Sequence, residues 1–235
     1  MKRIIVVALA ICMLGTVAFA QEGDGGGFGF QAGIALGTDV IINQAGVAET
    51  WNNLGFQPDL SFGNFGIGLD ITLRFQLTPA DGDALAIYGG DWIPNFEGNG
   101  KTFFDIYLPK IMYVRYGFRG DALYAKLGSI DDFTLGNGFI VGNYANTRFL
   151  PEQRIFGLQL NLDGALFSFP YVGVELLTGN LARFDVMGAR LFVRPLSSSG
   201  LPILDDLQVG ATIASDTKPE LWANLDPASD YVDKG

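Results

Sequence analysis

Hydrophobic and polar residues alternate strictly from Phe65 to Leu77, in the sequence FGIGLDITLRFQL. Every odd-numbered position in this stretch is large and apolar, and every even-numbered position is glycine or polar. Successive side chains of a β-strand point to opposite faces of its sheet, so the pattern predicts one strand with an apolar face and a polar face. The stretch is longer than the roughly 9–11 residues that a tilted strand needs to cross a bilayer.

The same alternation recurs along the chain and predicts further strands. The clearest of these occupy residues 28–37, 111–119, 122–127, 154–162, 184–194 and 206–214. Less regular strands are predicted at residues 84–88, 103–108 and 166–177, the last of which contains Pro170. Gly120-Asp121 and Asp163-Gly164 predict the turns of two hairpins. Residues 38–64 are less regular. Val40–Ile42 is compatible with a strand, Asn43–Asn53 shows no clean period and predicts a loop or one helical turn, and Pro58-Asp59 predicts a turn.

These strands predict an all-β fold, an antiparallel up-and-down transmembrane β-barrel. We expect about eight to ten strands over residues 28–214, either complete in this chain or part of a larger barrel. The alternative is a soluble exported β-sandwich, whose strands also alternate but whose outer face usually carries many Thr, Ser, Lys and Glu. Here the polar positions are rich in glycine, which makes room inside a narrow lumen, and the sequence therefore favours the barrel.

The N-terminus predicts export. Lys2 and Arg3 precede a short apolar run that closes with Ala18-Phe19-Ala20, the pattern of a secretory signal peptide over residues 1–20. Ile11 directly precedes Cys12, whereas a lipoprotein signal needs a small residue there. We expect a flexible glycine-rich leader at residues 21–27 and a polar tail at residues 215–235.

Composition narrows the function further. Without residues 1–20 the chain has 13 basic and 25 acidic residues, a net charge near −12, which disfavours nucleic-acid binding. The sequence has no histidine, and its single cysteine lies in the predicted signal peptide. Zinc sites built on His or Cys, Ser-His-Asp triads and Cys-His pairs are therefore excluded. We expect no enzyme activity, no cofactor and no metal.

The polar positions of the predicted strands carry charged residues that are candidates for lining the lumen. These are Asp70, Arg74, Arg115, Arg119, Lys126, Glu175, Arg190 and Arg194. Rings of charge set the ion preference of a pore. Pairs of Arg and acid can equally fill and brace a small barrel that conducts nothing, since side chains nearly fill an interior of this size.

The irregular stretch of residues 128–152 is a second candidate site. Its loop or constriction candidates are Asp131, Asp132, Gly136, Asn137 and Gly138. A phosphate loop needs a helix after it and a Lys at set spacing, which are missing here. Adjacent residues on an extended chain point to opposite faces, and no calcium-loop spacing follows, which disfavours a carboxylate site at the two aspartates. We favour a tight loop or an inward-folded segment, which could narrow the barrel and which carries Phe133, Phe139, Tyr144 and Phe149.

Taken together, the chain resembles bacterial outer-membrane β-barrel proteins of the porin-like and spirochaete-like kinds. The resemblance rests on the AFA cleavage site, the alternating FGIGLDITLRFQL, the hairpin IMYVRYGFRGDALYAKLG and the stretch LGSIDDFTLGNGFIVGNY. It implies a barrel in the outer membrane, often a passive pore or a surface antigen, and it transfers no catalytic residue. Such barrels commonly end in a strand with a terminal aromatic residue, whereas this sequence ends in YVDKG, so a tail follows the last strand or the closing strand lies outside this sequence.

The sequence thus predicts an exported protein of the bacterial outer membrane. Its expected partners are outer-membrane lipid and small polar solutes, with no nucleic acid, and its expected role is a passive pore. Two alternatives stay open at this point: a non-conducting structural or surface-binding barrel of the antigen or adhesin kind, and the soluble exported β-sandwich.

Overall fold

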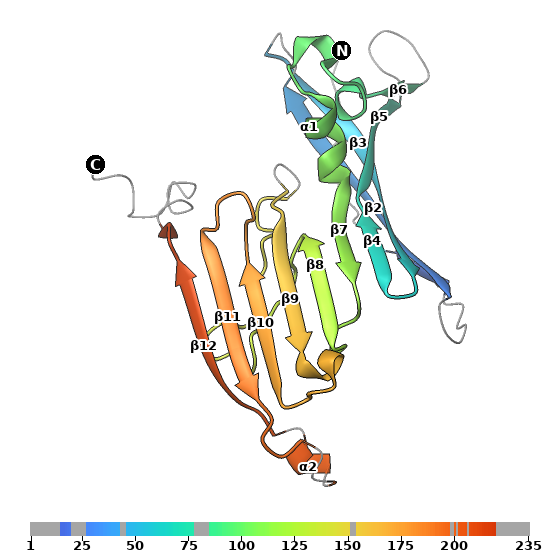
Figure 1. The fold of residues 1–235 in the computed structure, drawn as a ribbon. Helices are drawn as coiled ribbons and strands as arrows, with labels where there is room; N and C mark the ends of the chain where they lie inside the picture. Colours follow the sequence, from blue (N-terminus) through green and yellow to red (C-terminus); the bar gives the residue numbers. More distant parts are fainter. Residues whose placement is uncertain are drawn as a thin grey trace, which may run out of the picture. The chain divides into compact units, whose positions relative to one another are not determined.

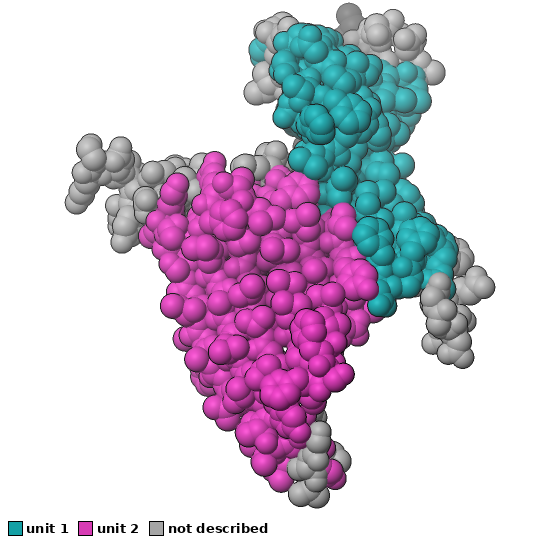
Figure 2. Space-filling model, in the orientation of Figure 1, with its two compact units in different colours: residues 1–112 teal, residues 113–235 magenta. Residues whose placement is uncertain are grey.

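The computed structural model describes residues 15–19, 27–42, 46–77, 85–150, 154–197, 200, 202–205 and 207–219. The chain divides into two compact units, Met1–Met112 and Tyr113–Gly235, which are coloured separately in Figure 2. The described residues form mostly antiparallel β-sheet, which confirms the β-rich fold class. Within these residues, no helix is long and apolar enough to cross a membrane.

The first unit is built on long antiparallel hairpins (Figure 1). Its strands are β1 (Gly15–Phe19), β2 (Phe28–Ile42), β3 (Ala48–Phe62), β4 (Phe65–Leu69), β5 (Ile71–Leu77) and β6 (Leu85–Ile87). β2 pairs with β1 and β3, β3 pairs with both β4 and β5, and β5 pairs with β6. The backbone of β1 thus pairs where the sequence predicts the end of a signal peptide, and cleavage there stays a prediction.

The loop predicted at Asn43–Asn53 is wrong from Ala48 onward, because β3 begins there, whereas the possible strand at Val40–Ile42 is the end of β2. The two strands pair without interruption from Phe28 opposite Phe62 to Ile42 opposite Ala48. The turn predicted at Pro58-Asp59 lies inside β3 instead. Between Asn53 and Phe62 the strand has the same two-faced alternation as its neighbours, and Pro58 takes an apolar position in it. A proline in a strand was interpreted as a turn, although the alternation on both sides of it indicated a strand.

The strand predicted at Phe65–Leu77 forms, but its ladder is interrupted at Asp70. The register on both sides of the interruption places Pro58 of β3 opposite Leu69. Proline has no N–H to donate to the ladder, which explains why the pairing lapses here. The N–H of Asp70 donates instead to the carbonyl oxygen of Lys110, at 2.7 Å.

The strand predicted at residues 103–108 is also wrong, because this stretch forms helix α1 (Phe103–Tyr107). Thr102 caps the helix: its side chain accepts from the N–H of Asp105, and the Asp105 carboxylate accepts from the N–H of Thr102. This reciprocal capping box satisfies N–H groups that a helix start otherwise leaves unpaired. The short 3-10 helices η1 (Gly89–Asp91) and η2 (Phe96–Gly98) precede α1, and η3 (Leu108–Lys110) follows it.

The second unit is an antiparallel meander in which each strand pairs with the next. Its strands are β7 (Ile111–Tyr116), β8 (Leu123–Gly128), β9 (Gly157–Asp163), β10 (Val172–Thr178), β11 (Val186–Val193) and β12 (Val209–Asp216), with helix α2 (Pro202–Asp205) before the last strand. The up-and-down order and the hairpin over residues 111–127 are therefore confirmed. Within this unit the strand order runs from β7 to β12, and the sheet formed by the described strands is not closed.

The tight Asp163-Gly164 turn is wrong in its detail. The 3-10 helix η4 (Gly164–Phe167) follows β9 there, with the Asp163 side chain accepting from the N–H of Ala165 at 2.8 Å. β10 then begins at Val172, beyond Pro170, and not at the predicted residue 166.

The register of the second unit separates its two faces. Tyr124, Asn161, Glu175, Arg190 and Thr212 lie directly opposite one another on successive strands from β8 to β12. We call the face that carries this row the polar face. Their neighbours in sequence form a row of aliphatic residues, and we call that side the apolar face; the row is Leu123, Leu162, Val174, Leu191 and Ala211.

Candidate functional site

Residues 129–146, which join β8 to the region before β9, fold back over the polar face. We call them the covering segment. Phe133 and Tyr144 form an isolated antiparallel bridge within it, with backbone N–H to O distances of 2.9 and 2.8 Å. Ile130, Phe133 and Leu135 are buried together with Leu177 of β10, whose side chain belongs to the polar face. The segment is therefore packed on the sheet by its own small hydrophobic core.

Two glycines of the polar face receive the buried side chains of the covering segment. A Cβ atom on Gly157 would lie 2.6 Å from Cδ1 of Ile130, and a Cβ atom on Gly188 would lie 2.7 Å from Cδ1 of Leu135. Real Cβ atoms do not approach other atoms so closely, so any larger residue would push the segment away. The glycine-rich polar positions that indicated a lumen are thus used, at these two sites, to seat the covering segment.

Asn146 anchors the end of the covering segment. Its Oδ1 accepts from the N–H of Ile130 at 2.7 Å. Its Nδ2 lies within hydrogen-bond distance of three carbonyl oxygens, those of Gly179 at 2.9 Å, Ile155 at 3.1 Å and Gly128 at 3.4 Å. These carbonyls belong to three separate stretches of chain, so one buried side chain ties the segment to the ends of β8 and β10 and to the approach to β9.

Acidic side chains make three contacts between the covering segment and the rest of the second unit. Two of them lie on the polar face. Lys126 Nζ lies 3.3 Å from Oδ2 of Asp131. Glu175 accepts the N–H of Gly136 at 3.0 Å through Oε2, and its Oε1 lies 3.3 Å from Nη1 of Arg190. Gly136 has φ +56°, a left-handed conformation that favours glycine, and a Cβ atom there would lie 2.5 Å from Arg190 Nε.

Arg119, in the turn after β7, makes the most exposed of these contacts. Its guanidinium donates to the carboxylate of Asp132 through both Nη atoms, the bidentate geometry that gives the strongest Arg–carboxylate pairing. The hydrogen bond from Arg119 lowers the pKa of Asp132 below its ordinary value, and the same contact raises the pKa of Arg119.

The structure therefore brings part of the two candidate sets together. Arg119, Lys126, Glu175 and Arg190 from the predicted strands meet residues of the irregular stretch, namely Asp131, Asp132 and Gly136. Of the other two loop candidates, Asn137 accepts from the N–H of Phe139 within the segment, and the N–H of Gly138 donates to Leu135. The inward-folded segment was expected to carry four aromatic residues. For Phe139 that prediction is wrong, because this residue is 88% exposed.

The remaining lumen candidates have partners elsewhere. Arg194 lies 2.5 Å from the carboxylate of Asp163 within the second unit. Arg115 donates to the carbonyl of Gly117 at 3.0 Å, and its guanidinium lies over the ring of Phe118.

In the first unit, Arg74 bridges two carboxylates. Its Nε lies 2.7 Å from Asp39 and its Nη1 lies 2.6 Å from Asp91. Burial raises the pKa of Asp91, against the opposing influence of Arg74 and Lys110. Asp70 accepts a long contact of 3.5 Å from Gln57.

Several residues of the site were missed in the sequence. Asp39 continues the polar positions of β2, and a longer run of alternation would have included it. Asn146 and Asp163 carry no sequence signal of their own, because their roles depend on contacts that the sheet register creates. Among the described residues, there is no group of three or more His, Cys, Asp or Glu side chains that could hold a metal ion.

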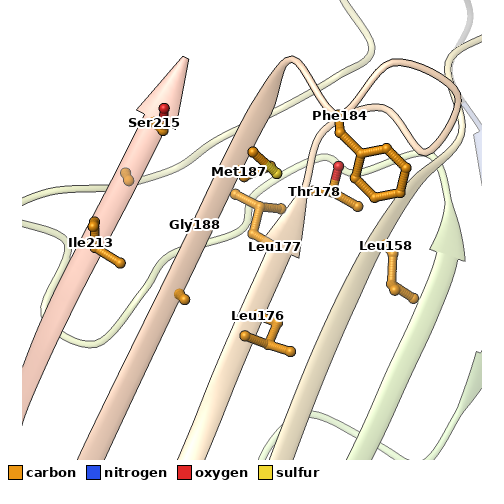
Figure 3. Close-up of a pocket in the computed structure, with 11 residues that line it drawn as sticks. Leu158, Leu176, Leu177, Thr178, Phe184, Met187, Gly188, Ile213 and Ser215 are labelled. Atoms are coloured by element: carbon orange, nitrogen blue, oxygen red, sulfur yellow. The ribbon is translucent and has the colours of Figure 1, made fainter. Parts of the chain in front are cut away.

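The apolar face of the second unit is exposed. Leu191 is 61% exposed and Ile213 is 71% exposed, although both are large and aliphatic. Figure 3 shows Leu158, Leu176, Met187 and Ile213 projecting from one side of the strands, around an open apolar groove of about 420 Å³. The trace of the covering segment passes behind the strands in the same view. The sheet thus has one face packed against its own chain and one apolar face without such a cover among the described residues.

Replacing Asn146 with leucine should release the covering segment. The change leaves one buried N–H and the carbonyls that Asn146 now binds without a partner, at a cost of about 3 kcal/mol. Limited proteolysis of the refolded protein should then cut within residues 129–146 at least tenfold faster than in the wild type. Asn137→Leu, at the exposed tip of the same segment, is the control and should leave the rate unchanged; equal rates in all three proteins would contradict the anchoring role.

The contact between Arg119 and Asp132 should make the covering segment sensitive to acid. Because the pKa of Asp132 is lower in the folded state, its contribution to stability is present above the unfolded pKa and is lost as the pH falls through the folded pKa. Hydrogen exchange at Phe133 and Leu135 should be slower in the wild type than in Asp132→Asn at about pH 6, and the difference should shrink progressively as the pH falls below about 3.9. A difference that persists unchanged at the lower pH would refute this assignment.

Comparison with known proteins gives no identification. No protein-family model, no curated protein and no solved structure matches this chain.

Proposed function

We propose that this chain forms an outer-membrane β-barrel, or a part of one, that acts as a passive pore for small polar solutes. In this proposal the apolar faces of the strands contact lipid, and the polar faces line a water-filled interior. The covering segment then narrows that interior. The proposal agrees with the export predicted from residues 1–20.

The exposed apolar faces are the observation that carries the proposal. In the second unit the apolar face includes large aliphatic residues that are exposed on β8, β10, β11 and β12, namely Leu127, Leu176, Leu191 and Ile213, and Leu158 of β9 between them is half-buried. Soluble monomeric proteins rarely expose contiguous apolar patches of this kind. In hydrocarbon, exposing these apolar side chains carries no free-energy penalty, whereas in water it does.

The first unit independently supports contact between the apolar faces and lipid. Exposed large apolar residues occupy one face of its long hairpins: Phe28, Ile34, Leu36, Val40, Leu54, Phe56, Phe62, Phe65 and Leu77. The rings of Phe28 and Phe62 are 5.1 Å apart at the paired ends of β2 and β3, and Phe65 lies opposite Phe62. Aromatic residues at strand ends are typical of the girdles that mark the membrane interface.

Lipid explains these faces better than a second sheet does. In a β-sandwich the apolar face packs on a partner sheet and the polar face meets water. In the second unit the arrangement is reversed: the polar face holds the covering segment, and the apolar face is the exposed one. An inward polar face that is partly filled by its own chain is a common feature of transmembrane barrels.

The charges of the polar face suit the passage of polar solutes. Arg119, Lys126 and Arg190 each lie beside an acid, so the face presents both signs of charge within a short distance. Such a surface keeps a narrow interior wet without a strong preference for either sign of ion.

A non-conducting barrel is the second candidate, and one specific observation favours it. The covering segment contributes three of its residues to a buried hydrophobic core, and contacts of this kind fill space as well as shape it. If the segment closes the interior, the remaining role is structural or lies in contacts that exposed loops make with a partner.

Adjacent residues of β3 allow the lipid contact to be tested. Phe56 and Gln57 are both exposed but belong to opposite faces. In a bilayer, Phe56→Arg should cost about 2–4 kcal/mol, whereas Gln57→Arg meets water and should cost little. Refolding into phospholipid vesicles, followed by heat-modifiable gel migration, should show a reduced folded fraction for Phe56→Arg alone. Equal folding of both variants, or a wild-type protein that stays soluble without detergent, would contradict the lipid face and revive the sandwich.

Planar-bilayer recording tests the pore. The refolded wild-type protein should give conductance steps above background, and Asn146→Leu should increase the step size or its fluctuation, because the covering segment is then less firmly held on the polar face. Wild-type protein that inserts into bilayers without any conductance would exclude the pore and leave the non-conducting barrel.

A further inference from the structure

A cavity of about 390 Å³ lies between the covering segment and the polar face, near β8 and β9. Its volume falls within the range of about 300–1,000 Å³ that is usual for sites that bind small molecules. Its walls come from the turn after β7, two strands and the covering segment, and they include Arg119, Tyr124, Asp132, Phe133, Asn143 and Asn161, together with Thr134.

The cavity has a buried floor and a charged rim. Tyr124 and Phe133 are each only 4% exposed. The side chains of Arg119 and Asp132 are 49% and 57% exposed, and they pair with each other at the rim. A molecule that enters therefore passes a neutralised ion pair and then meets aromatic rings.

Polar groups inside the cavity region have hydrogen-bonding capacity to spare. Oδ1 of Asn161 is buried and has no partner among the described residues. Thr134 Oγ1 accepts from the N–H of Asn143 at 2.9 Å, which leaves its hydroxyl proton available to a ligand. Buried polar groups without partners are costly, so a ligand that supplies both donors and acceptors would relieve that cost.

The balance of charge selects the ligand. An anion would be attracted by Arg119 but repelled by Asp132, and a cation would meet the reverse. A molecule rich in hydroxyl groups offers donors and acceptors without net charge, which matches amide, hydroxyl and phenol side chains set around an aromatic floor.

We propose that this cavity binds a neutral polyhydroxylated solute of about monosaccharide size. This inference deepens the proposed function and rests on it, because it makes the polar face the path that such a solute follows. The site then gives the pore a preference for neutral sugars and polyols over charged solutes of the same shape.

Calorimetric titration of the full chain, refolded in detergent, tests the site with three probes of one ring shape. These are glucose, glucuronate and protonated glucosamine. Glucose should bind at least tenfold more tightly than either charged sugar. Asn161→Leu should weaken glucose binding about tenfold, and Asn64→Leu, in the turn between β3 and β4, should leave it unchanged.

Two rim variants keep the test decisive if Asn161→Leu fails to fold. Asp132→Asn leaves Arg119 uncompensated and should improve glucuronate binding about fivefold, whereas Arg119→Gln should do the same for glucosamine. No glucose binding to a protein that conducts would overturn the cavity assignment and leave the pore intact. Glucose binding with this order of affinities in a protein that does not conduct would overturn the pore and support the site. Tighter binding of either charged sugar by the wild type would also overturn the assignment.

Discussion

The close approach of the covering segment to the polar face is the contact on which the second unit depends. Ile130 and Leu135 occupy space that a side chain at Gly157 or Gly188 would otherwise fill. Because Gly157 and Gly188 have no side chain, the segment can approach the sheet closely enough to make dispersion contacts. With that seat formed, the bridge between Phe133 and Tyr144 and the contacts of Asn146 follow from the same placement.

The charged residues determine where the covering segment lies on the second unit. The acids of the covering segment face cations of the second unit, Asp131 with Lys126 of β8 and Asp132 with Arg119 in the turn after β7. The Arg119–Asp132 pair is about half exposed and contributes little to stability, so its role is better described as fixing which part of the segment lies beside the turn after β7. Glu175 positions the segment most directly, since one carboxylate binds both a strand side chain and the backbone of the segment.

The alternation of the strands could be predicted because it depends only on the two-residue period of a β-strand. The same rule failed at β3, where Pro58 was interpreted as a turn, and at α1, where local capping by Thr102 outweighed the aromatic residues that favour a strand. The candidate charges of the polar face were identified from their positions. Their partners were not, because Asp39, Asn146 and Asp163 come into place only through the register of distant strands, which no local pattern specifies.

Asn146 also links the alignment of three strands to one buried side chain. The three carbonyls within reach of its amide group come from the end of β8, the approach to β9 and the end of β10. They converge on one point only after those strands have aligned, so the amide has nothing to bind while the meander is incomplete. The full set of Asn146 contacts therefore requires the correct pairing of β8, β9 and β10, because a misaligned strand would withdraw one of the three carbonyls.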